Sequence, residues 1–416
     1  MKELKVLELF GGIGAPRKAL TRLGIDFKVV DYVEIDKYAV KSYNALYNEN
    51  YEPQDVTQWN KDIEIDLIFH GSPCQDFSIA GNGKGGDEGS GTRSSLLYET
   101  VRIVEKTKPK YVIWENVKAV INKNHKHNFD NYLEKMEELG YTNYYQVLNA
   151  KDYGIPQNRE RVFTISILKN KDFTFPLKQT LNLRLKDVLE TEVDPKYYLT
   201  DKMINYVLDM NDVQKGTKWD NRANNGVLNK EIALTIGVRS DEAQRGGVTN
   251  FVIDNLDKEI KVKEYKSYIS WEDKKGRINT QDHRAFKDDM YSGTVPSMER
   301  GIPKVLIKNA TKKGYIEACD GDGIDLPYPD SETRRGRVQK QRSHTITTSD
   351  NLGVTKDMRI RKLTPLECWR LMGFGDEDFY KAQKVNSNSQ LYKQAGNSIV
   401  VNVLEAIFTN LLKENR

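Results

Sequence analysis

The stretch VLELFGGIG, residues 6–14, decides the fold. Residues 6–10 form an apolar run typical of a buried strand, and the glycines that follow end that strand in a flexible loop. Pro16 then begins a helix that ends before Gly24, because proline is favoured in the first helical turn and glycine just past the last one. Strand, loop and helix in this order indicate the first unit of a parallel sheet covered by helices.

Similar units recur as far as about residue 170. Strands are expected at residues 28–33, 67–69, 111–114 and 162–167, and a helix at 128–139, which Gly140 ends. The alternation predicts an α/β domain with a mostly parallel sheet, like the Rossmann-like domains that bind nucleotides.

The middle of the chain follows a different pattern. Residues 177–352 contain short strand-like segments, polar turns and mixed charge, and helical periodicity returns only after residue 361. We therefore expect a catalytic domain made of residues 1–176 and 353–416, interrupted by a smaller, β-rich domain at 177–352.

Composition excludes several classes of protein. The 416 residues include 64 basic and 60 acidic residues, and the net charge of +4 permits a polyanionic partner without requiring one. Three cysteines are too few for a disulfide framework, and their scatter predicts no metal site. No apolar run approaches the roughly 18 residues of a membrane helix, and no signal peptide is visible, so we expect a cytoplasmic protein without a membrane partner.

The glycine loop and the acids after it suggest a ligand. A dinucleotide site would have glycine where Arg17 stands, so the pattern that cradles a pyrophosphate is incomplete. Glu34, at the end of the second strand, could accept both hydroxyls of a ribose, and Asp55 could accept an adenine amine. Ribose and adenine without pyrophosphate fit S-adenosylmethionine better than NAD, although Glu34 could also be an ordinary surface acid.

Two further strand ends carry reactive side chains. Cys74 lies between Pro73 and Gln75 in a polar loop, which favours a reactive thiolate over a small buried hydrophobic residue. Glu115 ends an apolar strand, where burial can raise the pKa of a carboxyl group and make it an acid catalyst. Alternatively, Asn116 caps a helix and Glu115 is idle.

Basic residues form two other candidate sites. Arg159 and Arg161 have the spacing that puts both on one face of a strand, where they could hold a phosphate or a carboxylate. Residues 333–349 contain a basic stripe without acidic residues, which is either a nucleic-acid contact or a solvated loop. Glycine-rich residues 81–91 are either a mobile lid or a surface insertion.

An ordered series of motifs resembles that of the DNA cytosine-5 methyltransferases of bacterial and phage type II modification systems. The motifs are FGGIG (10–14), GSPCQDFS (71–78), ENV (115–117), QNRER (157–161), RKLTPLEC (361–368) and GNS (396–398). They span residues 4–168 and 358–412 and leave the middle as the region that reads the DNA sequence in that family. Ala15 stands where many members have another glycine, and Ile35 where many have an aromatic residue.

The resemblance implies transfer of a methyl group from S-adenosylmethionine to carbon 5 of a cytosine flipped out of a specific short duplex sequence. It assigns a covalent adduct at carbon 6 to Cys74, stabilisation of the ring to Glu115 and Arg161, and Arg159 to the same catalytic set. The cofactor positions carried over are Phe10, Gly12, Ile13, Gly14, Glu34, Ile35, Asp55, Val56, Pro73, Leu96, Asn397 and Ser398. The DNA-binding positions are Gln75, Ser78, Arg334, Arg335 and Arg337.

The same resemblance implies S-adenosylhomocysteine as product, duplex DNA as partner and no metal. We expect a monomer associated with the bacterial nucleoid, with or without a cognate restriction endonuclease. An RNA cytosine-5 methyltransferase is the main rival, but such relatives have little sequence between the QNRER and RKLTPLEC motifs. A non-catalytic DNA-binding protein would not need Cys74 or Glu115, and a dinucleotide oxidoreductase would need the missing glycine.

Overall fold

A computed structural model of the protein describes residues 3–73, 93–169, 172–199 and 359–413, most of 305–356, and the strands within 233–284. The chain divides into two compact units. Unit 1 comprises residues 1–190, 344–350 and 364–416, and unit 2 comprises residues 191–343 and 351–363.

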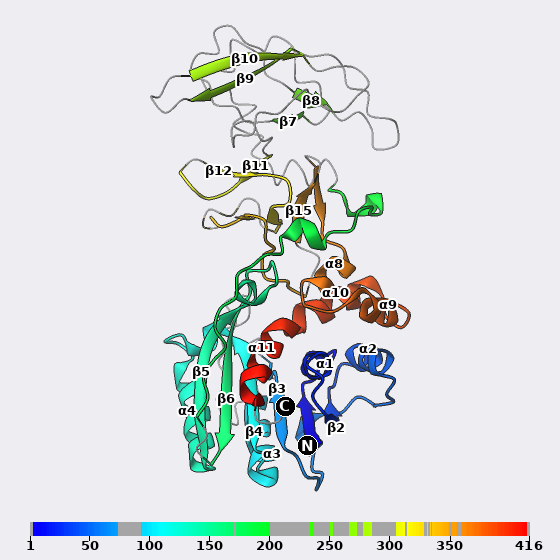
Figure 1. Ribbon diagram of the computed structural model, residues 1–416, viewed down its shortest axis with the longest axis vertical. Coiled ribbons are helices and arrows are strands. Elements are labelled where there is room, and N and C mark those ends of the chain that lie inside the picture. Colours follow the sequence, from blue (N-terminus) through cyan, green and yellow to red (C-terminus); the bar gives the residue numbers. More distant parts are fainter. Residues whose placement is uncertain are drawn as a thin grey trace. The chain divides into compact units, whose positions relative to one another are not determined.

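Unit 1 is built on a six-stranded sheet with the order β2-β1-β3-β4-β6-β5 (Figure 1). Its strands are β1 (Leu4–Leu9), β2 (Phe27–Val33), β3 (Leu67–His70), β4 (Tyr111–Val117), β5 (Tyr141–Asn149) and β6 (Glu160–Leu168). The first four strands run parallel, whereas β6 is antiparallel to both β4 and β5. The predicted α/β fold with a mostly parallel sheet is confirmed.

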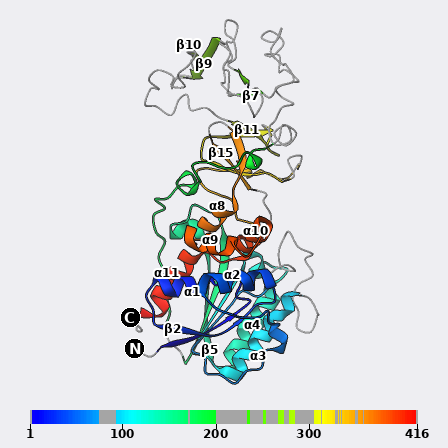
Figure 2. The same cartoon turned by 90° about the vertical axis from the view of Figure 1, so that its right-hand side faces the viewer.

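Helices accompany this sheet in unit 1. They are α1 (Ala15–Arg22), α2 (Lys37–Tyr47), α3 (Leu97–Thr107), α4 (Lys126–Glu138), α8 (Pro365–Arg370), α9 (Asp376–Gln383), α10 (Asn388–Asn397) and α11 (Val401–Leu411). Figure 2 shows α3 and α4 along one face and α1 with α11 along the other. Within the part of the chain described, no helix is long and apolar enough to cross a membrane.

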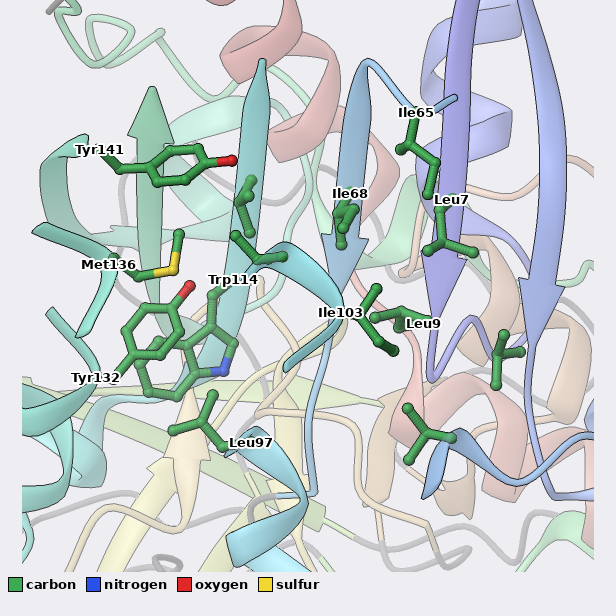
Figure 3. Packing of buried hydrophobic residues seen from close by; sticks show 14 of the residues in the cluster. Leu7, Leu9, Ile65, Ile68, Leu97, Ile103, Trp114, Tyr132, Met136 and Tyr141 are labelled. Carbon is green, nitrogen blue, oxygen red and sulfur yellow. The ribbon is translucent and has the colours of Figure 1, made fainter. Parts of the chain in front are cut away.

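The core lies between the sheet and the pair α3 and α4. Its buried side chains come from β1, β3 and β4 on one side and from the two helices on the other (Figure 3), and include Leu7, Leu9, Ile68, Leu97, Ile103, Trp114, Tyr132 and Met136. Each such side chain contributes about 1.5–3 kcal/mol when it is fully buried. This packing fixes the strands that carry the predicted site.

Strand register brings the predicted motifs to one edge of the sheet. Leu9 at the end of β1 pairs with His70 at the end of β3, and His70 pairs with Trp114 of β4. The glycine loop, the turn at residues 71–73 and Glu115 each follow one of these three residues, so they begin at the same level of the sheet.

The described part of unit 2 is β-rich and antiparallel. A four-stranded sheet, β14-β13-β15-β16, is accompanied by the pairs β11–β12, β9–β10 and β7–β8. The bounds are β7 (Ala233–Thr235), β8 (Asn250–Val252), β9 (Lys266–Glu272), β10 (Ile278–Arg284), β11 (Val305–Lys308), β12 (Tyr315–Ala318), β13 (Gly323–Asp325), β14 (Val338–Gln339), β15 (Leu352–Lys356) and β16 (Arg359–Lys362). The β-rich character expected of the middle region is thus found.

The unit boundaries differ from the predicted ones at 176 and 353. Residues 177–190 belong to unit 1, where the backbone N–H of Glu190 donates to Glu367 Oε1 at 2.8 Å. Residues 344–350 also belong to unit 1, whereas 353–363 belong to unit 2 because β15 pairs with β13 and β16 pairs with β15. Local pattern could not reveal these long-range pairings.

Candidate active site

The glycine loop after β1 has a backbone that only small residues fit. Gly12 and Gly14 have φ values of 54° and 75°, in the left-handed region that favours glycine. A Cβ at Gly14 would lie 2.6 Å from ring carbons of both Tyr43 and Tyr47, whereas a Cβ at Gly12 would point into open space. The loop is therefore closed toward α2 and open at Gly12.

Tyrosine hydroxyls hold this loop by its carbonyl groups. Tyr32 donates to the carbonyl of Gly12 at 2.7 Å, and Tyr47 donates to the carbonyl of Gly14 at 2.7 Å. Tyr43 stacks on Tyr32 with ring centroids 3.8 Å apart. The sequence analysis missed these tyrosines, although the four-residue spacing of Tyr43 and Tyr47 puts both on one helix face.

Glu34 lies beside the open side of the loop. Its Oε2 accepts the backbone N–H of Gly12 at 3.1 Å, and its Oε1 accepts that of Asp36 at 2.8 Å. Burial raises the pKa of Glu34, and these two backbone N–H groups counteract the rise. The structure thus brings Glu34 and the glycine loop together, as their positions in the sequence suggested.

The next acid, Asp55, caps the short 3-10 helix η1 (Val56–Gln58) and is exposed. Arg102 of α3 fixes this turn by donating to the carbonyls of Val56, at 3.2 Å, and Trp59, at 3.0 Å. The buried Asp31 accepts the indole N–H of Trp59 at 2.7 Å. Neither Arg102 nor Asp31 was expected from the sequence, because their contacts are with a distant turn.

The other predicted cofactor residues divide by exposure. Ile35 is 68% exposed although it is apolar, and Asn397 is exposed at the end of α10. Ile13, Val56 and Ser398 are buried, and Phe10, Pro73 and Leu96 are half-buried.

Glu115 and Arg161 form a mostly buried ion pair. Arg161 Nε lies 3.0 Å from Glu115 Oε1, and the two residues come from the neighbouring strands β6 and β4. Burial raises the pKa of Glu115, although Arg161 and Arg159 oppose the rise. A carboxyl group with a raised pKa retains its proton more readily, which suits an acid catalyst.

The turn after β3 adjoins this pair. A Cβ at Gly71 would lie 3.9 Å from Glu115 Oε2. Ser72 is tied to β4, because its hydroxyl accepts the indole N–H of Trp114 at 3.0 Å and its carbonyl accepts the amide of Asn116 at 3.3 Å. Asn116 therefore holds the turn, rather than capping a helix as the alternative interpretation had it.

Arg159 donates to main-chain carbonyl groups. It precedes β6 and is buried, and it donates to the carbonyls of Ile346 at 2.9 Å, Gly396 at 3.0 Å and Ser398 at 2.8 Å. Arg161 pairs with the Glu115 carboxylate, and Arg159 holds main-chain carbonyls. Both arginines lower the pKa of Glu115, and the expectation that the two act as a pair on a phosphate or a carboxylate stays a prediction.

Several predicted residues lie outside the described part of the chain. These are Cys74, Gln75, Ser78, Arg334 and the glycine-rich residues 81–91. Of the basic stripe, Arg335 is exposed, but Arg337 is only 1% exposed and donates to the carbonyls of Asp325 and Leu326. This placement contradicts the expectation that Arg337 contacts DNA, since its guanidinium holds unit 2 together.

Among the described residues, no set of three or more His, Cys, Asp or Glu side chains could hold a metal ion.

Comparison with protein families decides the class of this protein. The model of the C-5 cytosine-specific DNA methylase family matches residues 4–413. The chain belongs to this family. The prediction from the ordered motifs is confirmed, and the protein is a DNA cytosine-5 methyltransferase, a class that uses S-adenosylmethionine.

Phage and bacterial members of the family resemble the chain over its full length. The orphan methyltransferase M.SPRI of Bacillus phage SPR is 32% identical, with 99% of this chain and 98% of that protein covered. The type II methyltransferase M2.ScrFI of Lactococcus lactis subsp. cremoris is 31% identical, with 99% of both covered.

Solved structures show the same methylase fold at lower identity. The Entamoeba histolytica methyltransferase EhMeth aligns with a TM-score of 0.55 at 16% identity, over 100% of both chains. A mutant of Spodoptera frugiperda DNMT2 aligns with a TM-score of 0.54 at 17% identity, over 99% of this chain and 100% of that one.

Another buried acid, Glu8, lies next to the methylase glycine loop. Oε1 of Glu8 accepts the backbone N–H of Arg17 at 3.0 Å, and Oε2 accepts the hydroxyl of Tyr43 at 2.7 Å. Burial raises the pKa of Glu8 to about 7, against the lowering effects of Tyr43 and Arg17. An acid within an apolar strand was a visible signal that the sequence analysis did not use.

This raised pKa has a consequence for stability. Between its ordinary pKa of 4.5 and about 7, folded Glu8 binds more protons than unfolded Glu8, so the free energy of unfolding falls as pH rises through this range. We expect Glu8 to account for a loss of about 3 kcal/mol, which levels off above pH 7. Urea unfolding at a series of pH values should show a flatter profile for Glu8→Gln than for the wild type.

Glu34 and Glu115 remain in that variant, so the difference between the two profiles isolates Glu8. Glu3→Gln, at an exposed position in the same segment, serves as the control and should follow the wild-type profile. Equal pH slopes for Glu8→Gln and the wild type would contradict the raised pKa.

Proposed function

We propose that this methyltransferase modifies carbon 5 of a cytosine flipped out of a specific short duplex sequence, through a covalent adduct between Cys74 and carbon 6. The buried pair of Glu115 and Arg161 carries the proposal. It adjoins the turn at Gly71, and Cys74 follows that turn three residues later in the sequence.

Addition of a thiolate makes the ring reactive. Carbon 5 of cytosine is a weak nucleophile, and attack of the Cys74 sulfur on carbon 6 pushes an electron pair into the ring. Glu115, which burial keeps closer to protonation, then donates a hydrogen bond or a proton to ring nitrogen 3. Arg161 orients Glu115 and stabilises negative charge at the carbonyl oxygen.

The adduct is resolved by elimination. Bound S-adenosylmethionine would supply an electrophilic methyl group: as carbon 5 bonds to it, the bond from the methyl group to the sulfonium sulfur breaks and S-adenosylhomocysteine is left. The proton on carbon 5 then leaves to water, and its electron pair restores the double bond between carbons 5 and 6 as the Cys74 thiolate is expelled. A proton donated to ring nitrogen 3 returns to Glu115.

The residues at the glycine loop fit this cofactor. Gly12 borders open space, Glu34 presents a carboxylate beside it, and Ile35 offers an exposed apolar side chain. We assign the ribose hydroxyls to Glu34, one face of adenine to Ile35 and the adenine amine to Asp55. Backbone groups and packing from Phe10, Ile13, Gly14, Val56, Pro73, Leu96, Asn397 and Ser398 complete the assignment.

Access to the base requires flipping. A duplex stacks the reacting atoms inside, and extruding one cytosine costs about a few kcal/mol. We assign closure over the DNA to Gln75 and Ser78, and sequence reading to unit 2. Among the described residues of the basic stripe, we propose the exposed Arg335 for a phosphate or base contact.

A flipping enzyme needs only one face on its site, so we propose action as a monomer. The names of the relatives include both orphan and type II enzymes. Methylation by this chain alone is compatible with a cognate restriction endonuclease that acts independently.

The decisive experiment uses tritiated S-adenosylmethionine with unmethylated duplex DNA and an RNA control, followed by bisulfite mapping. We expect label in DNA at cytosines within one recurring short sequence. Cys74→Ser should abolish methyl transfer and leave calorimetric binding of S-adenosylhomocysteine nearly unchanged. Full activity of Cys74→Ser would exclude the covalent mechanism, and label in RNA alone would exclude the DNA specificity.

Loss of the Glu34 carboxylate should weaken cofactor binding selectively. Charge-assisted hydrogen bonds contribute about 1.5–3 kcal/mol, so Glu34→Ala should raise the dissociation constant of S-adenosylhomocysteine by roughly 10- to 100-fold. Glu52→Ala, which removes an exposed acid nearby in the sequence, is the matched control. An unchanged calorimetric titration for Glu34→Ala would refute the ribose assignment.

Removal of the exposed charge in the stripe should lower DNA affinity. If Arg335 neutralises one phosphate, Arg335→Ala should reduce the slope of log affinity against log salt concentration by about 1. Lys312→Ala removes an equally exposed charge from the turn between β11 and β12 and controls for net charge. The slopes are measured by fluorescence anisotropy. Equal slopes for both variants would mean that the stripe is a solvated loop and makes no contact with DNA.

A further inference from the structure

Residues 344–348, which we call the strap, lie within unit 1 although the chain on either side belongs to unit 2. The chain leaves unit 2 after Ser343, contributes the strap to unit 1, and returns to unit 2 at Asn351. The strap is therefore covalently continuous with the recognition unit at both ends.

Unit 1 binds the main chain of one strap residue at both its N–H and its carbonyl group. The backbone N–H of Ile346 donates to Gln157 Oε1 at 3.1 Å, and its carbonyl accepts Arg159 Nη1 at 2.9 Å. The Ile346 side chain is only 2% exposed. Gln157 is completely buried, and its Nε2 donates to the carbonyl of Leu371 at 2.7 Å.

A third bond and a close crossing fix the register of the strap. Thr345 Oγ1 donates to the carbonyl of Asn158 at 2.8 Å. A Cβ at Gly396 would lie 2.3 Å from the carbonyl oxygen of Thr347, so the strap crosses Gly396 at a distance that only glycine permits. The strap cannot slide along unit 1 without breaking these contacts.

The loop that grips the strap also reaches both reactive regions. Arg159 binds the carbonyls of Gly396 and Ser398, the neighbours of Asn397 in the proposed cofactor set. Arg161, two residues later, pairs with Glu115. Residues 157–161 thus touch the strap, the cofactor motif and the catalytic acid.

We propose that the strap couples DNA binding by the recognition unit to cofactor affinity and catalysis, and that Gln157 is the positioning residue on which this coupling depends. The proposal rests on the proposed function of DNA methylation. A displacement of the strap changes the contacts of Arg159 and Gly396 together, which gives the two binding events a shared free-energy term.

The test is a binding cycle on the full-length protein. The dissociation constant of S-adenosylhomocysteine is measured by calorimetry for the free protein and for the protein saturated with a duplex carrying the mapped target sequence. We expect wild-type protein to bind the product at least about fivefold more tightly when DNA is bound, as typical coupling energies imply. Methyl transfer is assayed on the same samples.

Gln157→Met removes both hydrogen-bonding groups and keeps an unbranched side chain of similar length. The coupling ratio is the dissociation constant of S-adenosylhomocysteine without DNA divided by the one with DNA. For Gln157→Met we expect this ratio to fall below about 2, and the dissociation constant of the free protein to change by less than about twofold. We expect kcat to fall about tenfold or more. Thr345→Val removes one strap bond with little change in shape and should lower the ratio by a smaller factor.

Asn143→Leu is the matched control, because it removes a carboxamide that bridges the Leu133 carbonyl and the Ser166 hydroxyl away from the strap. If Gln157→Met and Thr345→Val both have the same coupling ratio as Asn143→Leu, the proposal is overturned. Wild-type protein that methylates DNA with a coupling ratio of one would overturn the coupling alone. Wild-type protein that binds the product but does not methylate DNA would overturn the proposed function and the coupling with it.

Discussion

The guanidinium of Arg159 joins parts of the catalytic unit that lie far apart in the sequence. Its bond to Gly396 spans 237 residues and its bond to Ile346 spans 187. A buried cation without partners costs several kcal/mol, whereas here three carbonyl oxygens satisfy it. Arg159 thus links the QNRER motif to the GNS motif and to Ile346 within unit 1.

Burial and two arginines act in opposite directions on the acidity of Glu115. Burial raises the pKa of Glu115, and the two nearby arginines lower it. Arg161 makes an ion pair with Glu115, and Arg159, which donates to carbonyl groups, also lowers this pKa. The effect of burial is the larger one, so the pKa of Glu115 remains above its ordinary value despite its positively charged neighbours.

Much of the fold could be predicted from the local sequence pattern, and the predictions that failed have one cause in common. Strand ends and glycines placed Glu34 beside the glycine loop and Glu115 at the same edge of the sheet, because parallel strands end together. Arg337 was misjudged, since its partners are main-chain carbonyls that no sequence spacing specifies, and the carbonyl partners of Arg159 could not be predicted for the same reason. The strap was missed for the same reason, because Ile346 is held by side chains from a motif almost two hundred residues earlier.

The glycine loop shows in physical terms why a dinucleotide does not suit this site. A pyrophosphate site needs free backbone N–H groups at the loop and the start of its helix. Here the N–H groups of Gly11, Gly12 and Gly14 donate to the Val33 carbonyl, the Glu34 carboxylate and the Gly11 carbonyl. Tyr32 and Tyr47 hold the loop from the carbonyl side, so its shape is fixed before any ligand binds. The N–H groups of these three glycines are therefore bonded within unit 1, which disfavours a pyrophosphate at this loop.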